Sequence, residues 1–140
     1  MEQKLFTYTF LEEYQQHIRP VIKEIDVFLR GASEPICAKD AACVLDLNVS
    51  EVLRILTELG FDGNTMDKQG FLSVMERGSS PVCQMYGREM ELGSPSIYTA
   101  AQIAYIYGLE EEVVKKACQK LQIKEVTAFV MPLIFAEIPY

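Results

Sequence analysis

The chain has 140 residues, of which 49% are hydrophobic and 24% charged, and its 20 acidic and 13 basic residues give a formal net charge of −7. This length and apolar content are typical of one globular domain with a buried core, and they exclude a disordered chain. The acidic balance argues against a protein that coats nucleic acid, because non-specific binding needs a basic face. We expect a single domain over 1–140.

The sequence carries no recognisable signal for export or for a membrane. Polar residues such as Glu2, Lys4 and Thr7 interrupt the start of the chain, where a signal peptide needs an unbroken apolar stretch. The longest apolar run, 128–136, contains Pro132 and is far shorter than the roughly 20 residues of a membrane span. We expect a cytoplasmic protein without a membrane partner.

Four cysteines are spread along the chain without a Cys-x-x-Cys pair. A chain of this size with no secretory signal does not need a disulfide framework, and a single histidine leaves a zinc site short of ligands. Unpaired cysteine behaves as a small apolar residue. We expect buried free thiols at Cys37, Cys43, Cys83 and Cys118.

The segment 1–31 is predicted as one long helix or a pair of helices. Thr9 followed by Glu12 forms a capping box, which satisfies two backbone N–H groups at the start of a helix. Beyond it, apolar residues recur at intervals of three and four, as on the buried face of a helix. Pro20 either kinks this helix or lies in the first turn of a second one, and Gly31 is the expected end.

Two stretches, 36–61 and 98–123, resemble each other at an offset of 62 residues. Each is predicted as a short helix, a tight turn and a longer helix, which together make a helical hairpin of the helix-turn-helix type. We therefore expect an all-α fold, a compact helical bundle with two repeated hairpins. The matched pairs are Ala42 with Ala104, Leu47 with Leu109, Val52 with Val114, Arg54 with Lys116, Leu59 with Leu121 and Phe61 with Ile123.

Residues 38–56 of the first hairpin, AKDAACVLDLNVSEVLRIL, combine a small alanine on the first helix, an apolar turn residue, a Val-Ser step and a valine on the second helix. This pattern resembles the helix-turn-helix of excisionase-type and MerR-type DNA-binding domains. The resemblance implies that the second helix begins in the major groove, with Asn48, Ser50, Glu51 and Arg54 facing outward. The alternative function is thus a DNA-binding transcriptional regulator, with Lys115 and Lys116 as secondary phosphate contacts. Acidic neighbours on the same hairpins disfavour it.

The connector 62–96 is the least regular part of the sequence. A polar turn after Met66 leaves two structures open, and in the first of them residues 65–66 and 71–72 flank that turn as a short β-hairpin. In the second, a helix begins near residue 71 and ends at Gly78. Ser80 and Pro81 then mark the start of a further helix.

The region 77–88 is a third candidate, for a small enzyme or an anion-binding protein. Ser80 and the first backbone N–H groups of the following helix are suited to a phosphate. Cys83 and Arg88 invite comparison with cysteine phosphatases, but their spacing is one residue too short for that loop. The purely structural interpretation of this region, a loop and a helix cap, is favoured. No catalytic set, metal cluster or nucleotide-binding motif is visible in the sequence, and we expect no cofactor and no metal.

The apolar tail, 126–140, is expected to dock on this chain or on a partner, since its hydrophobicity is high for a free end. Tyrosines gather on the second hairpin, and tyrosine is frequent at protein interfaces. The candidate contact residues are Tyr98, Tyr105, Tyr107, Phe135 and Tyr140. We expect a small non-enzymatic regulatory or protein-interaction module that binds a protein partner or forms a homo-oligomer.

Overall fold

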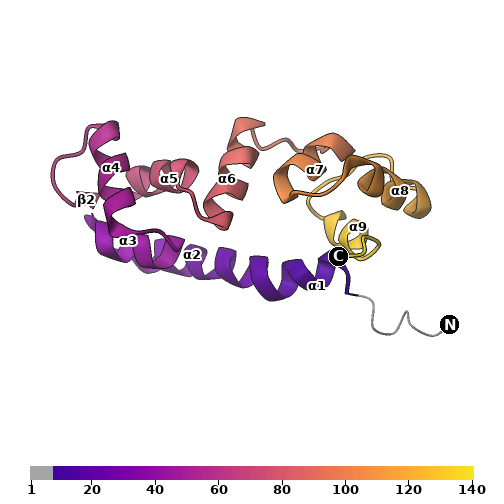
Figure 1. Cartoon of the computed structure of the whole chain (residues 1–140), viewed down its shortest axis with the longest axis horizontal. Coiled ribbons are helices and arrows are strands. Elements are labelled where there is room, and N and C mark those ends of the chain that lie inside the picture. The colour runs from indigo at the N-terminus through magenta and orange to yellow at the C-terminus, as the bar shows by residue number, and fades with distance from the viewer. Residues whose placement is uncertain (1–7) are drawn as a thin grey trace. The chain divides into compact units, whose positions relative to one another are not determined.

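A computed structural model gives the structure of the chain and describes residues 8–140. The described chain is mostly helical and contains one short two-stranded sheet (Figure 1), which confirms the predicted all-α class. It divides into two compact units, which we describe separately. Unit 1 comprises Met1–Pro20 and Glu91–Tyr140, and unit 2 comprises Val21–Met90. The expectation of a single domain stays a prediction.

The N-terminal helical residues form three consecutive elements: α1 (Phe10–Glu13), the π-helix η2 (Tyr14–Ile18) and α2 (Arg19–Gly31). The predicted capping box is present. The Thr9 side chain accepts from the backbone N–H of Glu12, and the Glu12 side chain accepts from the backbone N–H of Thr9. Pro20 lies in the first turn of α2, as one of the two alternatives predicted. Since proline has no N–H to donate four residues back, the wider π turn directly before it accommodates the missing bond.

Unit 2 contains the two-stranded sheet and most of its helices in a continuous stretch of chain. Strand β1 pairs antiparallel with β2, with Ile36 opposite Met66. The elements are β1 (Ile36–Cys37), α3 (Ala38–Leu45), α4 (Val49–Leu59), β2 (Thr65–Met66), α5 (Lys68–Arg77) and α6 (Pro81–Glu91). The predicted hairpin between residues 65–66 and 71–72 is wrong, because the second pair lies inside α5. The helical alternative is confirmed with its end at Gly78, but α5 begins at Lys68, before the predicted start near residue 71.

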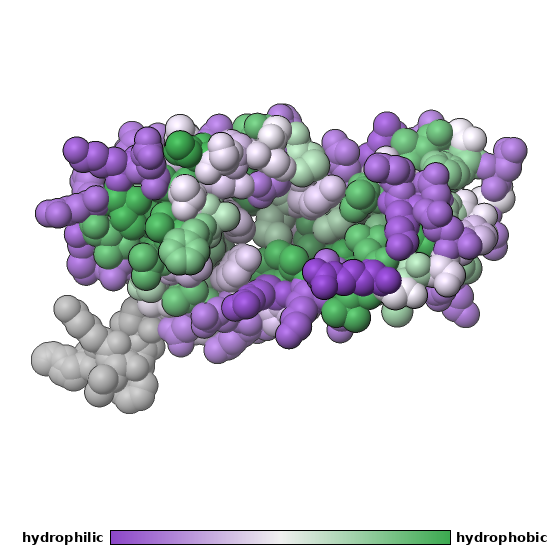
Figure 2. All heavy atoms as spheres, turned by 180° about the vertical axis from the view of Figure 1, so that it is seen from behind, coloured by the Kyte–Doolittle hydropathy of each residue, from purple (hydrophilic) through white to green (hydrophobic). Residues whose placement is uncertain are grey.

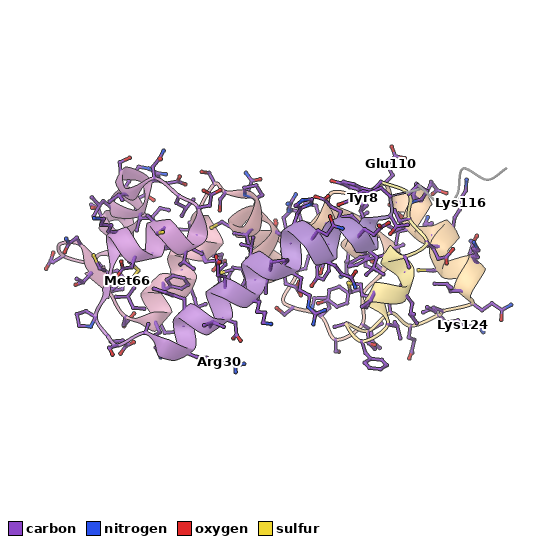
Figure 3. All side chains as sticks on the ribbon, turned by 90° about the horizontal axis from the view of Figure 1, so that it is seen from below. Tyr8, Arg30, Met66, Glu110, Lys116 and Lys124 are labelled. Atoms are coloured by element: carbon purple, nitrogen blue, oxygen red, sulfur yellow. The ribbon has the colours of Figure 1, made fainter. Side chains whose placement is uncertain are left out.

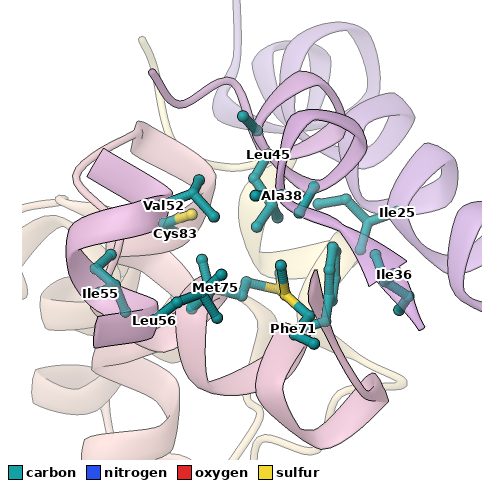
Figure 4. Close-up of a cluster of buried hydrophobic side chains, with 14 residues drawn as sticks. Ile25, Ile36, Ala38, Leu45, Val52, Ile55, Leu56, Phe71, Met75 and Cys83 are labelled. Atoms are coloured by element: carbon teal, nitrogen blue, oxygen red, sulfur yellow. The ribbon is translucent and has the colours of Figure 1, made fainter. Parts of the chain in front are cut away.

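The core of unit 2 lies where α3, α4 and α5 meet (Figure 4). On α4 the buried residues Val52, Ile55 and Leu56 recur at the spacing of one helix face. Phe71 of α5 is fully buried, and its ring centroid lies 5.5 Å from that of Phe28 on α2. The helices of this unit are therefore held together by one apolar cluster rather than by their short strands.

Unit 1 contains α7 (Ala100–Tyr107), α8 (Glu111–Leu121) and α9 (Met131–Phe135), together with α1 and η2. An aromatic cluster forms its core, in which the rings of Phe10 and Phe135 are 4.7 Å apart. The backbone N–H of Phe10 donates to Ile138 at 2.8 Å, and that of Tyr140 donates to Tyr8 at 2.8 Å. The apolar tail is thus docked on this chain, as predicted.

Each unit contains a short helix followed by a longer one, within the stretches 36–61 and 98–123. Helices α3 and α7 have 8 residues each, and α4 and α8 have 11 each. The turn residues Asp46 and Gly108 both have positive φ, and in both turns the next N–H bonds back into the first helix at 2.9 Å. The interpretation of the hairpins as copies of one unit stays a prediction.

Candidate functional site

The outer face of α4 carries three of the residues predicted to contact DNA. Asn48 and Ser50 are exposed at its first turn. The Arg54 side chain is 59% exposed, but its guanidinium lies 3.2 Å from a carboxylate oxygen of Glu58 on the same helix. Val49 and Leu53 are also exposed, one helical turn apart. This face therefore combines small polar groups, a paired charge and two apolar side chains.

Glu51 does not face outward as the DNA-binding interpretation requires. Its carboxylate accepts the backbone N–H of Ser79 at 2.9 Å and the Ser79 hydroxyl at 2.8 Å. These bonds tie the first turn of α4 to the turn between α5 and α6. Glu51 is a structural residue of unit 2.

The two predicted lysine contacts lie in the other unit, on α8. The Lys115 ammonium lies 3.2 Å from a carboxylate oxygen of Glu111 and 3.5 Å from one of Glu112, and the hydrogen bond that it donates to Glu111 is the main cause of its raised pKa. Lys116 is exposed. Figure 3 shows Lys116 and Lys124 pointing in different directions. Lys116 on α8 and Lys124, which follows the end of that helix, therefore do not point to one common patch.

The region 77–88 does not bring its candidate residues together. Arg77 lies 3.9 Å from Glu58 of α4, and Arg88 donates to a carbonyl of its own helix at 3.2 Å. The Ser80 hydroxyl is buried and donates to the carbonyl of Leu45 at 2.7 Å. Cys83 is fully buried, and burial raises the pKa of its thiol. Each of these side chains is bonded or buried separately, so they do not converge on one site.

The four cysteines are all free thiols, but only Cys83 is buried. Cys43 is exposed on α3, so the prediction of a buried thiol is wrong there, and Cys37 and Cys118 are half-buried. Among the residues described, no group of three or more Cys, His, Asp or Glu side chains is placed to hold a metal ion. In the same part of the chain, no helix combines the length and apolar character that crossing a membrane requires.

The predicted aromatic contact residues divide between surface and core. Phe135 is 1% exposed and Tyr107 packs against it with ring centroids 5.0 Å apart, so Phe135 belongs to the core and not to a surface. Tyr98 is half-buried, and its backbone N–H bonds to Val126. Tyr105 and Tyr140 are the two that remain largely exposed, at 46% and 63%.

The most exposed apolar side chains around α9 were missed by the sequence interpretation. Phe129 is 90% exposed and Leu133, four positions on, is 58% exposed. We call the exposed residues Ala128, Phe129, Pro132 and Leu133 the α9 surface. Apolar atoms also gather over unit 1 at the left of Figure 2. The sequence did contain a hint of this surface. Met131, Ile134 and Phe135 recur at the spacing of one buried helix face, which leaves the residues between them exposed.

No protein-family model matches the chain, and no curated protein sequence or solved structure is similar to it. The resemblance of residues 38–56 to excisionase-type and MerR-type domains therefore stays a prediction from those residues alone.

Proposed function

We propose that this chain is a non-enzymatic protein-interaction module that binds its partner through the α9 surface. The observation that carries the proposal is the exposure of two large apolar side chains four positions apart, 90% for Phe129 and 58% for Leu133. Leaving such side chains in water instead of burying them forgoes about 1.5–3 kcal/mol each. Contiguous apolar side chains at a surface are typical of a contact site, whereas single ones are ordinary.

The charge distribution around α9 also supports a protein contact. Residues 126–136 contain no charged side chain, in a chain where a quarter of the residues are charged. At the border of this run, Glu137 lies 2.8 Å from Lys120 of α8, so its charge is already paired. Depletion of charge at the centre and polar groups at the rim are features of protein interfaces.

The packing beneath the surface suits this role. Ile134 and Phe135 are fully buried and anchor α9 in the core of unit 1. Leu133 is therefore held by the buried residues of its own helix, and Phe129 lies in the turn that directly precedes α9. A surface that is ordered before binding loses less conformational entropy when a partner docks. We interpret α7 and α8 as the scaffold that presents α9.

Fluorescence correlation spectroscopy in an extract of the cells that make this protein tests the proposal. We expect the labelled chain to diffuse more slowly there than when purified. The double variant Phe129→Ser, Leu133→Ser should restore the faster diffusion, whereas Val27→Ser, which changes another exposed apolar residue in unit 2, should not. Nuclease treatment should leave the slow diffusion unchanged. Slow diffusion that the double variant retains would contradict the proposal.

A second candidate is the DNA-binding regulator, favoured by one observation. Asn48 and Ser50 are exposed at the first turn of α4 and Arg54 about one turn further on, and in the domains that residues 38–56 resemble the corresponding helix reads bases from its first turns. Its test is the fluorescence anisotropy of labelled duplex DNA titrated with the chain. Binding that weakens steeply with salt, and that Arg54→Ala reduces, supports this function. No binding at low salt rejects it.

A further inference from the structure

We propose that Tyr8, Glu13 and His17 form a binding site for one divalent transition-metal ion, a property beyond the protein contact proposed above. Oε1 of Glu13 lies 2.9 Å from Nδ1 of His17 and 3.0 Å from the hydroxyl oxygen of Tyr8. The third side of this triangle, from the Tyr8 oxygen to Nδ1 of His17, is 3.5 Å. A carboxylate, an imidazole and a phenol thus meet in unit 1, and all three groups bind metal ions in proteins.

The distances between the three donor atoms match those around a single ion. Two donors that each bind an ion at about 2.1 Å are about 3.0 Å apart when their bonds meet at a right angle, and about 3.4 Å apart at the tetrahedral angle. The observed distances of 2.9, 3.0 and 3.5 Å are close to these values. An ion about 1 Å above the plane of the three atoms would lie about 2.1 Å from each. The imidazole of His17 is 61% exposed and has room to turn Nδ1 towards that point.

The backbone holds the three donors in place before an ion binds. Glu13 ends α1 and His17 lies in η2, four positions further on, so both side chains lie on one side of the helix. The carbonyl of Tyr8 accepts the backbone N–H of Tyr140 at 2.8 Å, so the docked tail fixes the residue that carries the third donor. Donors that are ordered in advance lose less conformational entropy on binding. A π-helical turn within a helix is rare and is frequently found at functional sites.

Charge and donor type indicate which ion fits. The net charge of −7 and the nearby carboxylate of Glu12 favour a cation. A nitrogen donor beside two oxygens favours copper or zinc over magnesium and calcium, which prefer oxygen alone. Without an ion, desolvation and the hydrogen bond to Glu13 raise the pKa of Tyr8, so its phenol is protonated. A bound cation reverses this effect, and the phenol oxygen binds the ion as its proton passes to the solvent.

Calorimetric titration of the purified chain with Cu²⁺, Zn²⁺ and Mg²⁺ tests this inference, after iodoacetamide has blocked the accessible thiols, which also bind copper and zinc. We expect one equivalent of Cu²⁺ to bind, Zn²⁺ to bind more weakly and Mg²⁺ not to bind. Tyr8→Phe, Glu13→Gln and His17→Gln should each weaken Cu²⁺ binding at least about tenfold. The matched controls Tyr105→Phe and Glu111→Gln, at exposed positions of unit 1, should leave it unchanged.

The copper complex should also carry a spectroscopic signature of each donor. Electron paramagnetic resonance should show coupling to one imidazole nitrogen, and visible absorption should show a charge-transfer band from phenolate to copper that Tyr8→Phe removes. Three outcomes would overturn the inference: no Cu²⁺ binding, Mg²⁺ binding as tight as that of Cu²⁺, or a Cu²⁺ complex that Tyr8→Phe leaves unchanged. Since the three side chains are exposed or half-buried, their variants are expected to keep their helix content, which circular dichroism checks.

Discussion

The carboxylate of Glu51 accepts two hydrogen bonds from Ser79, one from its backbone N–H at 2.9 Å and one from its hydroxyl at 2.8 Å. The two residues are 28 positions apart in the sequence. Their contact fixes the first turn of α4 against the turn before α6. It also removes from the outer face of α4 an acidic side chain that would repel phosphate.

Glu51→Ala should lower the free energy of unfolding by about 1–2 kcal/mol, because hydrogen bonds to a charged acceptor are worth more than neutral ones and this site is partly screened by solvent. Glu58→Ala, which removes an exposed carboxylate paired with Arg54 on the same helix, is the matched control and should cost less than about 0.5 kcal/mol. Urea unfolding measures both. Equal losses for the two variants would contradict the role assigned to Glu51.

Ser80→Ala should destabilise the chain by about 1–2 kcal/mol. The Ser80 hydroxyl is buried and donates to the carbonyl of Leu45 at 2.7 Å, and its removal leaves that carbonyl without this donor. Ser50→Ala, at an exposed position of α4, should leave the unfolding free energy within about 0.5 kcal/mol of the parent. A Ser80→Ala variant as stable as Ser50→Ala would show that the buried bond contributes little.

Gly87→Ala tests the close approach of α6 to α5. A Cβ at Gly87 would lie 2.7 Å from the backbone carbonyl oxygen of Glu76, which cannot move as a flexible side chain does. We expect a loss of about 1–3 kcal/mol in the free energy of unfolding. Gly31→Ala, where a Cβ meets nothing within 4 Å, should be neutral or stabilising by up to about 1 kcal/mol. Equal effects of the two substitutions would contradict the close approach of α6 to α5 at Gly87.

The thiols should react with iodoacetamide in the order of their exposure. Cys43 is exposed and should be alkylated first, Cys37 and Cys118 more slowly, and the fully buried Cys83 only when the chain unfolds. Mass spectrometry of peptides after timed quenching gives the order. Modification of Cys83 in the folded chain at a rate close to that of Cys43 would contradict its buried position.

Burial of the Cys83 thiol also makes the free energy of unfolding depend on pH. Its pKa in the folded chain is raised, chiefly by desolvation, above the value of about 8.5 in an unfolded chain. The folded state therefore keeps the proton where the unfolded state loses it. The associated stability is complete below about pH 8.5 and is lost as the pH rises through the folded pKa. Unfolding free energies should decline over this alkaline range, and Cys83→Ala should show a shallower decline.

The sequence predicted the local elements well and the long-range contacts poorly. The capping box at Thr9 and the helix end at Gly78 follow from patterns within a few residues. Strands of two residues are too short to show an alternating pattern, so their pairing was missed. The hydrogen bonds of Glu51 depend on tertiary packing, which a local pattern does not show. The residue type alone also does not show whether an apolar side chain such as Phe129 is buried or exposed.

Site-specific photo-cross-linking in living cells tests the proposed contact surface most directly. A benzophenone side chain is placed in turn at Phe129, Leu133, Leu53 and Val27, all of them exposed apolar positions. We predict protein adducts from Phe129 and Leu133, and only background from Leu53 and Val27. Adducts from Leu53 without any from Phe129 or Leu133 would contradict the α9 surface as the binding site and place the contact on α4.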